Sequence, residues 1–427
     1  MKNIEKYGLY IFLFLLPWQT RWIFHLGWIN GNTNEYLTKS LYLSDVVLVG
    51  LLILVFLNEK KFFSGAKKIF VSIRGKIFSL FLLWCLVSLF WAENMSLALQ
   101  RVFWIALATL LAMLIIRIKN NYEFFYALIL SLMLSAWLGV WQFLFRQAFA
   151  NKWLGLAAHD VSSGGTSYLE ISGDGNQAVR WLRAYGSFDH PNIFGVATAV
   201  GLLLSFWIYA CKKNKQKREE IFLLFATASF ALGIFSSLSR SALLGLLLGL
   251  LVIFFKEGFV KIRKPLRISA AMFAIMLVLY PAPYVARSNV DSRLERKSLD
   301  ERKVYFEQGK NMIEKNMMLG VGMGNYVQEL TREDPTKEAW SYQPIHNFFL
   351  LVWAELGIFG MLALAALLLF ICLKAWKGNG FGAAMLAVLL PAAFFDHWLW
   401  DLHFGVLLLG LIVGIILTNR GEQSLCA

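Results

Sequence analysis

Charged residues are scarce in this chain, and their scarcity excludes a soluble protein. Only 16% of the 427 residues are charged, whereas 58% are hydrophobic. The apolar runs approach the length of roughly 20 residues that a helix needs to cross a hydrocarbon layer about 30 Å thick. We therefore expect an all-α, polytopic integral membrane protein that forms a single transmembrane domain over residues 1–427.

Cysteines and acidic residues are also few. The cysteines show no CxxC spacing, and no two share one outer loop, so we expect neither a disulfide framework nor a metal site from Cys85, Cys211, Cys372 and Cys426. Lys and Arg outnumber Asp and Glu by 41 to 27, which gives a net charge of +14. Because the basic residues fall in short clusters between apolar runs, this charge indicates membrane topology rather than binding to nucleic acid.

The basic clusters determine the expected topology. They lie in residues 60–76, 212–218 and 256–267, which the positive-inside rule places in the cytoplasm. Counting outward from them puts both termini in the cytoplasm and the two longest loops, 146–190 and 285–345, on the opposite face of the membrane. We expect about twelve membrane helices, near residues 8–26, 41–57, 76–91, 97–116, 124–145, 191–210, 221–238, 241–255, 268–284, 346–373, 381–395 and 403–418.

The two long outer loops hold most of the polar sequence. The first loop, 146–190, is rich in glycine and serine, so we expect little regular structure in it. In the second loop, 285–345, the spacing of residues 299–317 predicts an amphipathic helix at the membrane surface. The less polar face of this helix carries Val304, Tyr305, Gln308, Met312 and Ile313.

Arg240 lies between two apolar runs, where a buried charge costs about 2.5–3.5 kcal/mol. One interpretation is an arginine that extends from the turn 236–241 to the lipid headgroups. The other is an anion site, since Arg183 and Arg101 would lie on the same face of the membrane. Guanidinium groups bind a diphosphate through paired donors and keep their charge, so three of them would suit a lipid diphosphate.

His346 stands where the second outer loop enters a long apolar helix, and Asn347 follows it. A histidine there can accept a proton near neutral pH, and the adjacent amide can orient a hydroxyl or the ring. The alternative is a polar residue that only caps the helix. Glu355, further along the same helix, is expected to be paired or protonated and to support a neighbouring helix.

A short outer turn from Asp396 to His403 carries two carboxylates and two imidazoles. This composition resembles a metal-ligand cluster, but its spacing matches no zinc pattern and its two tryptophans favour an interfacial hairpin. We therefore predict no metal here and regard Asp396 as a substrate or supporting contact. The glycines of 319–325 have no βαβ context, so we expect a turn after the surface helix rather than a phosphate loop.

Four stretches, taken in order, resemble the O-antigen ligase and polymerase family of bacterial membrane glycosyltransferases over about residues 180–405. They are Arg183–Asn192 before a membrane helix, Ser239–Leu244, Leu319–Asn325, and His346-Asn347 followed by Ala354–Gly360. The resemblance implies a GT-C-like transmembrane fold in the bacterial inner membrane, with the active site on its periplasmic face.

The resemblance also implies the reaction and its residues. A preassembled glycan would pass from undecaprenyl diphosphate to a hydroxyl of a glycan or lipid acceptor, such as lipid A-core, with no cofactor and no metal. In the family, the histidine at the position of His346 acts on the acceptor, and the arginines matching Arg183 and Arg240 hold the donor diphosphate. We add six predicted substrate contacts, which are Arg101, His190, Asn192, Asn347, Tyr305 and Asp396.

Two alternatives stay open at this point. Ligase and polymerase differ in the acceptor, and the shared motifs do not separate them. A flippase or carrier for lipid-linked sugars would also need basic residues at a diphosphate, but its polar site should lie near the bilayer midplane. The polar residues of this sequence lie in two outer loops, which favours the enzyme. Glu35 stands alone where a metal-dependent enzyme would carry paired acidic residues, which favours a metal-independent reaction.

Overall fold

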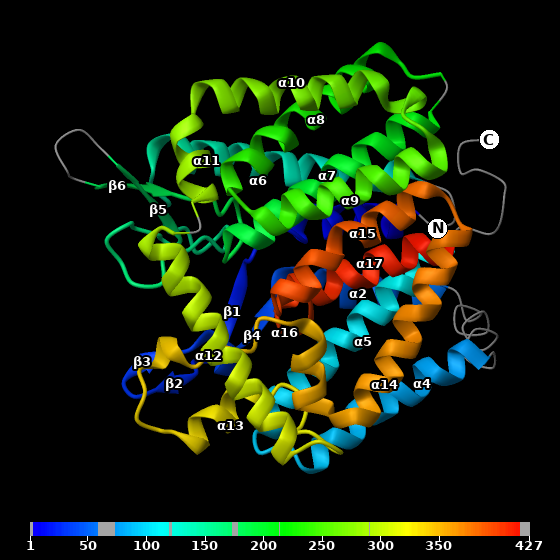
Figure 1. The fold of residues 1–427 in the computed structure, drawn as a ribbon. Helices are drawn as coiled ribbons and strands as arrows, with labels where there is room; N and C mark the ends of the chain where they lie inside the picture. Colours follow the sequence, from blue (N-terminus) through cyan, green and yellow to red (C-terminus); the bar gives the residue numbers. More distant parts are fainter. Residues whose placement is uncertain are drawn as a thin grey trace.

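The computed structural model is mostly helical and describes residues 3–58, 73–118, 122–172, 178–212, 214–289 and 291–418 (Figure 1). Long apolar helices run side by side and form the body of the protein. Short strands and two polar helices gather at one end of this body. We call this end, which carries α12 (Arg293–Lys315) and α13 (Tyr326–Glu333), the loop end.

The helices follow one another along the chain, and two long loops interrupt their order. The first half holds α1 (Asn3–Leu15), α2 (Leu43–Asn58), α4 (Ile73–Val87), α5 (Met95–Ile118), α6 (Phe125–Phe145), α7 (Pro191–Cys211) and α8 (Lys217–Ser237). The second half adds α9 (Arg240–Glu257), α10 (Arg263–Leu279), α11 (Pro281–Ser288), α14 (Phe348–Lys377), α15 (Gly380–Phe395), α16 (Trp398–Asp401) and α17 (His403–Thr418). The most extensive contacts join α15 to α9, α17 to α5 and α7 to α8, so segments far apart in the sequence form the core.

Among the residues that the structure describes, five helices are long and apolar enough to cross a membrane: α5, α6, α7, α8 and α14. A sixth crossing results if α10 and α11, which meet at a bend of 88°, form one broken span. Shorter apolar helices cover Leu43–Asn58, Gly75–Phe90, Gly380–Phe395 and His403–Thr418. The polytopic membrane fold is therefore confirmed. Each of the twelve predicted segments contains a helix, but the count of twelve crossings stays a prediction.

Both ends of the described chain lie at the same end of the helix bundle. Glu5, near the start of α1, forms an ion pair with Arg117 at 3.5 Å and accepts a hydrogen bond from Asn58 at 3.0 Å. Thr418, the last residue of α17, donates to Ile115 O at 3.4 Å. This arrangement agrees with an even number of crossings, and the side of the membrane on which the ends lie stays a prediction.

Three two-stranded antiparallel sheets were not expected, so the all-α class was wrong in part. The pairs are β1 (Arg21–His25) with β4 (Lys39–Tyr42), β2 (Trp28–Ile29) with β3 (Asn32–Thr33), and β5 (Tyr168–Ser172) with β6 (Ala178–Leu182). The hairpin of β5 and β6 lies in the first long outer loop, where we expected little regular structure. Apolar and polar side chains alternate along β5, which is the period of a half-buried strand.

Two predicted helices have different bounds. The segment predicted as one helix over 8–26 is helical only to Leu15, because Pro17 lacks the N–H that a continuing helix needs, and the chain then forms β1. The surface helix predicted over 299–317 begins earlier, at Arg293, where Ser292 Oγ accepts from the backbone N of the third helical residue.

The cysteines differ from the expectation that they form no disulfide. Cys211 forms a disulfide that the spacing of the cysteines did not predict.

The helix α14 is broken by Gly357, whose backbone φ is 65°. The glycine-rich loop 319–325 lies against this break, and Gly324 N donates to the Glu355 carboxylate at 2.8 Å. Trp400 Nε1 donates to the same carboxylate at 2.7 Å. Glu355 therefore ties α14 to the loop after α12 and to α16, which is the supporting role expected of it.

Replacing Gly357 by alanine should destabilise the fold. A Cβ atom there would lie 2.1 Å from Met318 O, and the left-handed backbone costs a residue with a side chain about 1–2 kcal/mol. We expect the Gly357→Ala protein to unfold several degrees below the wild type in a thermal melt in detergent. The control is Gly50→Ala, because a Cβ at Gly50 meets nothing within 4 Å. Equal midpoints for the two variants would contradict this account of the break.

Candidate functional site

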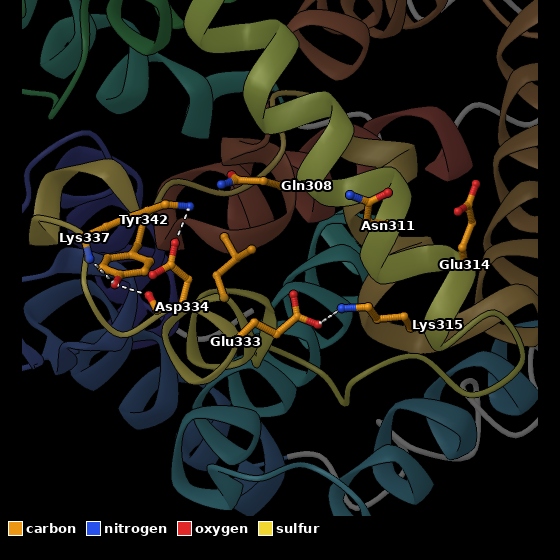
Figure 2. Close-up of a pocket in the computed structure, with 9 residues that line it drawn as sticks. Gln308, Asn311, Glu314, Lys315, Glu333, Asp334, Lys337 and Tyr342 are labelled. Carbon is orange, nitrogen blue, oxygen red and sulfur yellow. Dashed lines mark hydrogen bonds and ion pairs between the residues drawn. The ribbon is translucent and has the colours of Figure 1, made fainter.

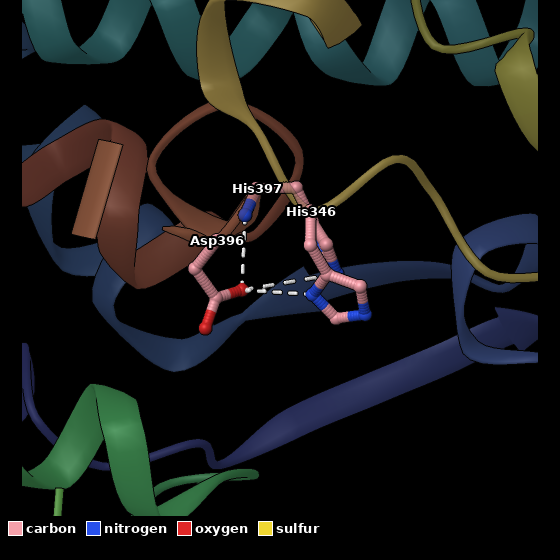
Figure 3. Close-up of side chains that lie close together, drawn as sticks. All are labelled: His346, Asp396 and His397. Atoms are coloured by element: carbon pink, nitrogen blue, oxygen red, sulfur yellow. Dashed lines mark hydrogen bonds and ion pairs between the residues drawn. The ribbon is translucent and has the colours of Figure 1, made fainter. Parts of the chain in front are cut away.

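Three side chains meet at the loop end of α14 and α15. His346 precedes α14, while Asp396 and His397 follow α15. The Nδ1 atom of His346 lies 3.8 Å from Asp396 Oδ1, and His397 Nε2 lies 3.9 Å from the same oxygen (Figure 3). We call these three residues the acid-histidine cluster. The packing of α14 against α15 brings its members together.

The acid-histidine cluster combines a neutral base with an ionised acid. Burial lowers the pKa of His346, and the neighbouring Asp396 carboxylate offsets part of that effect. Burial alone would raise the pKa of Asp396, but the histidines around it, first of all His346, hold it well below its usual range. His346 is therefore neutral at pH 7. Its side chain is 26% exposed, so it can take up a proton beside a carboxylate that stabilises the resulting cation.

His397 is held by a second carboxylate. Its Nδ1 atom lies 2.9 Å from Asp401 Oδ1, and its ring meets the ring of Tyr36 edge-on, with centroids 5.5 Å apart. Burial lowers the pKa of His397, but Asp401 and Asp396 together raise it above its ordinary value. His397 therefore becomes positively charged more readily than His346 and helps to keep Asp396 ionised.

The acid-histidine cluster also meets a simple geometric condition for a metal site. One ligand atom from each of its three residues lies within 4.8 Å of the others. Three protein ligands with an open position for water are typical of catalytic zinc sites. The spacing of the turn predicted no metal, and the absence of a metal requirement stays a prediction that a chelator can test.

Four arginines form a second group, which we call the arginine cluster: Arg183, Arg240, Arg287 and Arg302. They come from the segment before α7, the start of α9, α11 and α12, and lie within electrostatic range of one another. Burial, followed by the repulsion of neighbouring arginines, lowers the pKa of Arg183 to about 10. Even so, all four stay charged at neutral pH, so the cluster is a concentration of positive charge.

Among the residues that the structure describes, two members of the arginine cluster are paired with a carboxylate. Glu295 on α12 forms ion pairs with Arg240, at 2.6 Å, and with Arg287. Within the described parts of the chain, Arg302 makes no hydrogen bond or ion pair. Burial lowers the pKa of Arg302, as expected of a cation that has lost part of its hydration. An unpaired guanidinium beside other arginines is the arrangement expected of an anion site.

Asn192 joins the two clusters. Its Oδ1 atom accepts a hydrogen bond from Arg183 Nη2 at 2.9 Å, and its Nδ2 atom donates to Asp396 Oδ2 at 3.2 Å. His190 caps α7, since its Nδ1 atom accepts from Asn192 N at 3.2 Å. Burial lowers the pKa of His190 to about 3, which keeps this nitrogen an acceptor. The Arg183–Asn192 motif therefore connects the arginines to the acid-histidine cluster.

Three further predicted residues lie around the acid-histidine cluster. The ring of Tyr305 lies 5.6 Å from that of His346, centroid to centroid. Asn347 caps α14 and donates to a backbone oxygen at the end of α15 at 3.1 Å. Arg101 is 7% exposed and donates to the backbone oxygen of Asp401, so it supports α16 rather than the arginine cluster. Contact of these residues with the substrate stays a prediction.

The sequence reasoning missed Arg287, Glu295 and Arg302. The sequence did contain a signal for Glu295 and Arg302. Ser292 and Glu295 have the spacing of a capping box, which indicates that α12 begins earlier than residue 299. Glu295 and Arg302 then lie two helical turns apart on one face. No sequence pattern placed Arg287 with them, because α11 reaches the site only through the 88° bend after α10.

Comparison with known families finds a match in the middle of the chain. Residues 222–365 match the model of a family described as O-antigen ligase. This range includes Arg240, Arg302 and His346, but Arg183 and Asp396 lie outside it. The resemblance found in the sequence is confirmed over these residues. No curated protein sequence matches the chain.

Replacing Glu295 by glutamine should lower stability and free the arginine cluster for anions. The change leaves Arg240 and Arg287 without a carboxylate, and breaking a buried ion pair costs about 3–5 kcal/mol. We expect a lower thermal midpoint in detergent and a larger stabilisation by added pyrophosphate than in the wild type. The control is Glu307→Gln, an exposed position on the same helix. A pyrophosphate effect as small as that of the control would argue against an anion site here.

Proposed function

We propose that this chain, which carries an O-antigen ligase domain in residues 222–365, transfers a preassembled glycan from undecaprenyl diphosphate to an acceptor hydroxyl without a metal. The observation that carries the proposal is the link through Asn192 between an arginine cluster with one unpaired member, Arg302, and a neutral His346 next to an ionised Asp396. The two groups correspond to the two halves of a glycosyl transfer.

The arginine cluster suits the donor. A diphosphate offers several oxygen acceptors, and guanidinium groups bind them through paired donors. Arg302 is free to bind, and the diphosphate competes with Glu295 for Arg240 and Arg287. As the bond between the anomeric carbon and the diphosphate breaks, the diphosphate leaves with the electron pair. Positive charge fixed at that place stabilises the developing negative charge.

The acid-histidine cluster suits the acceptor. The Nδ1 atom of His346 faces Asp396. The Nε2 atom of the same ring is therefore left to take the proton of the acceptor hydroxyl. The acceptor oxygen then bonds to the anomeric carbon, and the ionised Asp396 stabilises the imidazolium ion. The proton passes to solvent afterwards. Every electron pair and proton is accounted for by the donor, the acceptor and His346, so the reaction needs no nucleotide.

The decisive assay uses purified protein in nanodiscs with undecaprenyl diphosphate-linked glycan extracted from the source cells. One reaction contains a glycolipid acceptor extracted from the same cells, a second contains none, and both are repeated with EDTA. Glycan on the separate acceptor would identify a ligase, and longer glycan on undecaprenyl diphosphate would identify a polymerase. Loss of either product with EDTA would overturn the metal-independent mechanism. Donor left unchanged in all reactions would favour a carrier.

Two substitutions should separate donor binding from chemistry. His346→Ala removes the base, so we expect turnover to fall by about 10²–10⁴-fold with little change in donor affinity. Arg302→Ala removes charged hydrogen bonds to the diphosphate, so the donor KM should rise by about 10-fold to 100-fold. His25→Ala, at an exposed histidine on β1, is the control. Full turnover of the His346→Ala protein would exclude His346 as the base.

The pH profile should show the lowered pKa of His346. Only the neutral ring can accept a proton, so activity should persist below pH 6.5 and fall as the pH drops through the pKa of His346. Asp396 raises that pKa, so Asp396→Asn should shift the acidic limb of kcat/KM to lower pH while it reduces turnover. Asp160→Asn, at an exposed position, should leave the profile unchanged. An acidic limb that moves to higher pH in Asp396→Asn would contradict this assignment.

A further inference from the structure

Two hollows lie along the side of α12 and meet at shared residues. One is lined by Gln308, Asn311, Glu314, Lys315, Leu330, Glu333, Asp334, Lys337 and Tyr342 and has a volume of about 380 Å³ (Figure 2). The other, of about 770 Å³, extends from Asp291, just before α12, to Gln308 on α12 and reaches Trp340. Gln308 and Lys337 line both, so the two hollows form one continuous trough. We call it the α12 groove, and its size suits a ligand of several sugar rings.

The α12 groove lies on a different face of α12 from the arginine cluster. Lys297, Val304, Gln308 and Lys315 line it and recur at spacings close to whole helical turns. Glu295 and Arg302, which belong to the arginine site, lie on another face of the helix. Tyr305 lines the groove as well, and its ring lies 5.6 Å from the ring of His346. A ligand in the groove therefore ends next to the proposed base.

Gln308 is the first residue that indicates a ligand in the groove. It stands where the two hollows meet, and its Oε1 atom is buried without a hydrogen-bond partner in the described part of the chain. An unpaired buried carbonyl costs free energy of the order of a hydrogen bond. Because this atom is buried, a hydroxyl in the groove can donate to it only when the amide turns toward the groove. Sugar hydroxyls are donors of this kind.

Trp340 supplies the second sign. Trp340 is 63% exposed, and charged residues such as Arg293, Lys297 and Lys337 line the same hollow. A large flat ring among polar side chains is suited to stacking against the apolar face of a sugar ring while the polar groups bind its hydroxyls.

The backbone at Trp340 is fixed by the beginning of the chain. Gln343 Nε2 donates to Trp340 O at 3.1 Å, and Gln343 Oε1 accepts from Tyr36 OH at 2.8 Å. Asn34 Nδ2 donates to Ala339 O at 3.0 Å. Because Tyr36 also contacts the acid-histidine cluster, the same hydrogen bonds set the distance between Trp340 and the proposed base.

The charges of the α12 groove are paired, some with one another and some with residues outside its lining. Lys315 lies 2.6 Å from Glu333, and Lys337 lies 3.1 Å from Asp334. Arg296 lies 3.0 Å from Asp291 at the other end. Neither positive nor negative charge is in clear excess in the groove, whereas positive charge is in excess in the arginine cluster. The lining therefore matches an uncharged, hydroxyl-rich ligand better than a polyanion.

We infer that the α12 groove binds the uncharged sugar chain of the acceptor, with Trp340 stacking on a ring, Gln308 accepting a hydroxyl, and Tyr305 marking the point where the chain reaches His346. The inference rests on the proposed function and names the class of acceptor that the site takes. The donor glycan belongs on the opposite side of the reacting carbon, where the arginine cluster holds its diphosphate.

Acceptor kinetics test the inference, using the extracted acceptor to which the wild-type protein transfers in nanodiscs. Trp340→Ala and Gln308→Leu should each raise the acceptor KM by about tenfold, the effect of losing one such contact, with kcat and the donor KM unchanged. Trp340→Phe should keep most of the affinity because it keeps a flat ring. The control is Trp153→Ala, since Trp153 is 77% exposed and lines neither hollow.

A binding measurement keeps the inference separate from the proposed reaction. Saturation-transfer NMR on the nanodisc protein uses the water-soluble oligosaccharide released from the extracted acceptor. Signals that Trp340→Ala removes and Trp153→Ala keeps would support the groove even if no transfer occurred. Transfer by the wild type with an unchanged acceptor KM in both groove variants would overturn the inference alone. A raised donor KM would overturn it in favour of the donor glycan.

Discussion

The amide of Asn192 is the contact on which the arrangement of the site depends. Its oxygen accepts from Arg183 and its nitrogen donates to Asp396, so one side chain fixes the distance between the arginine cluster and the acid-histidine cluster. An amide can do this because it donates and accepts without a charge of its own. A carboxylate here would neutralise the arginine, and a basic side chain would leave Asp396 permanently paired.

The supports of the site are buried polar contacts between distant segments. Glu355 joins the glycine-rich loop to α16, and Arg101 donates to the backbone of α16. The N-terminal hairpins reach the segment 334–342 through Asn30 and Asn34. Buried polar groups are expensive unless they are satisfied, so such contacts favour one arrangement of the loops over others. The shape of the α12 groove depends on these contacts.

The sequence predicted the helices better than the loops. Apolar runs indicated where helices occur because membrane burial imposes a strong and simple constraint on composition. The hairpins of β1 to β6 were missed because short strands outside the apolar runs leave a weaker pattern. The first helix ended early at Pro17, and the surface helix began earlier than expected because the signal at Ser292 and Glu295 was overlooked.

For the site, the sequence by itself determined the residue types: histidine at a helix entrance, arginine at helix starts, and a family resemblance that holds over 222–365. Only the tertiary structure decided which of them meet. It joined His346 to Asp396 and His397, added Arg287 and Arg302 to the arginines, and placed Arg101 beneath α16 instead. The physical reason is that composition and period are local properties, whereas a site is made by long-range packing of α14 on α15 and of α12 across the loop end.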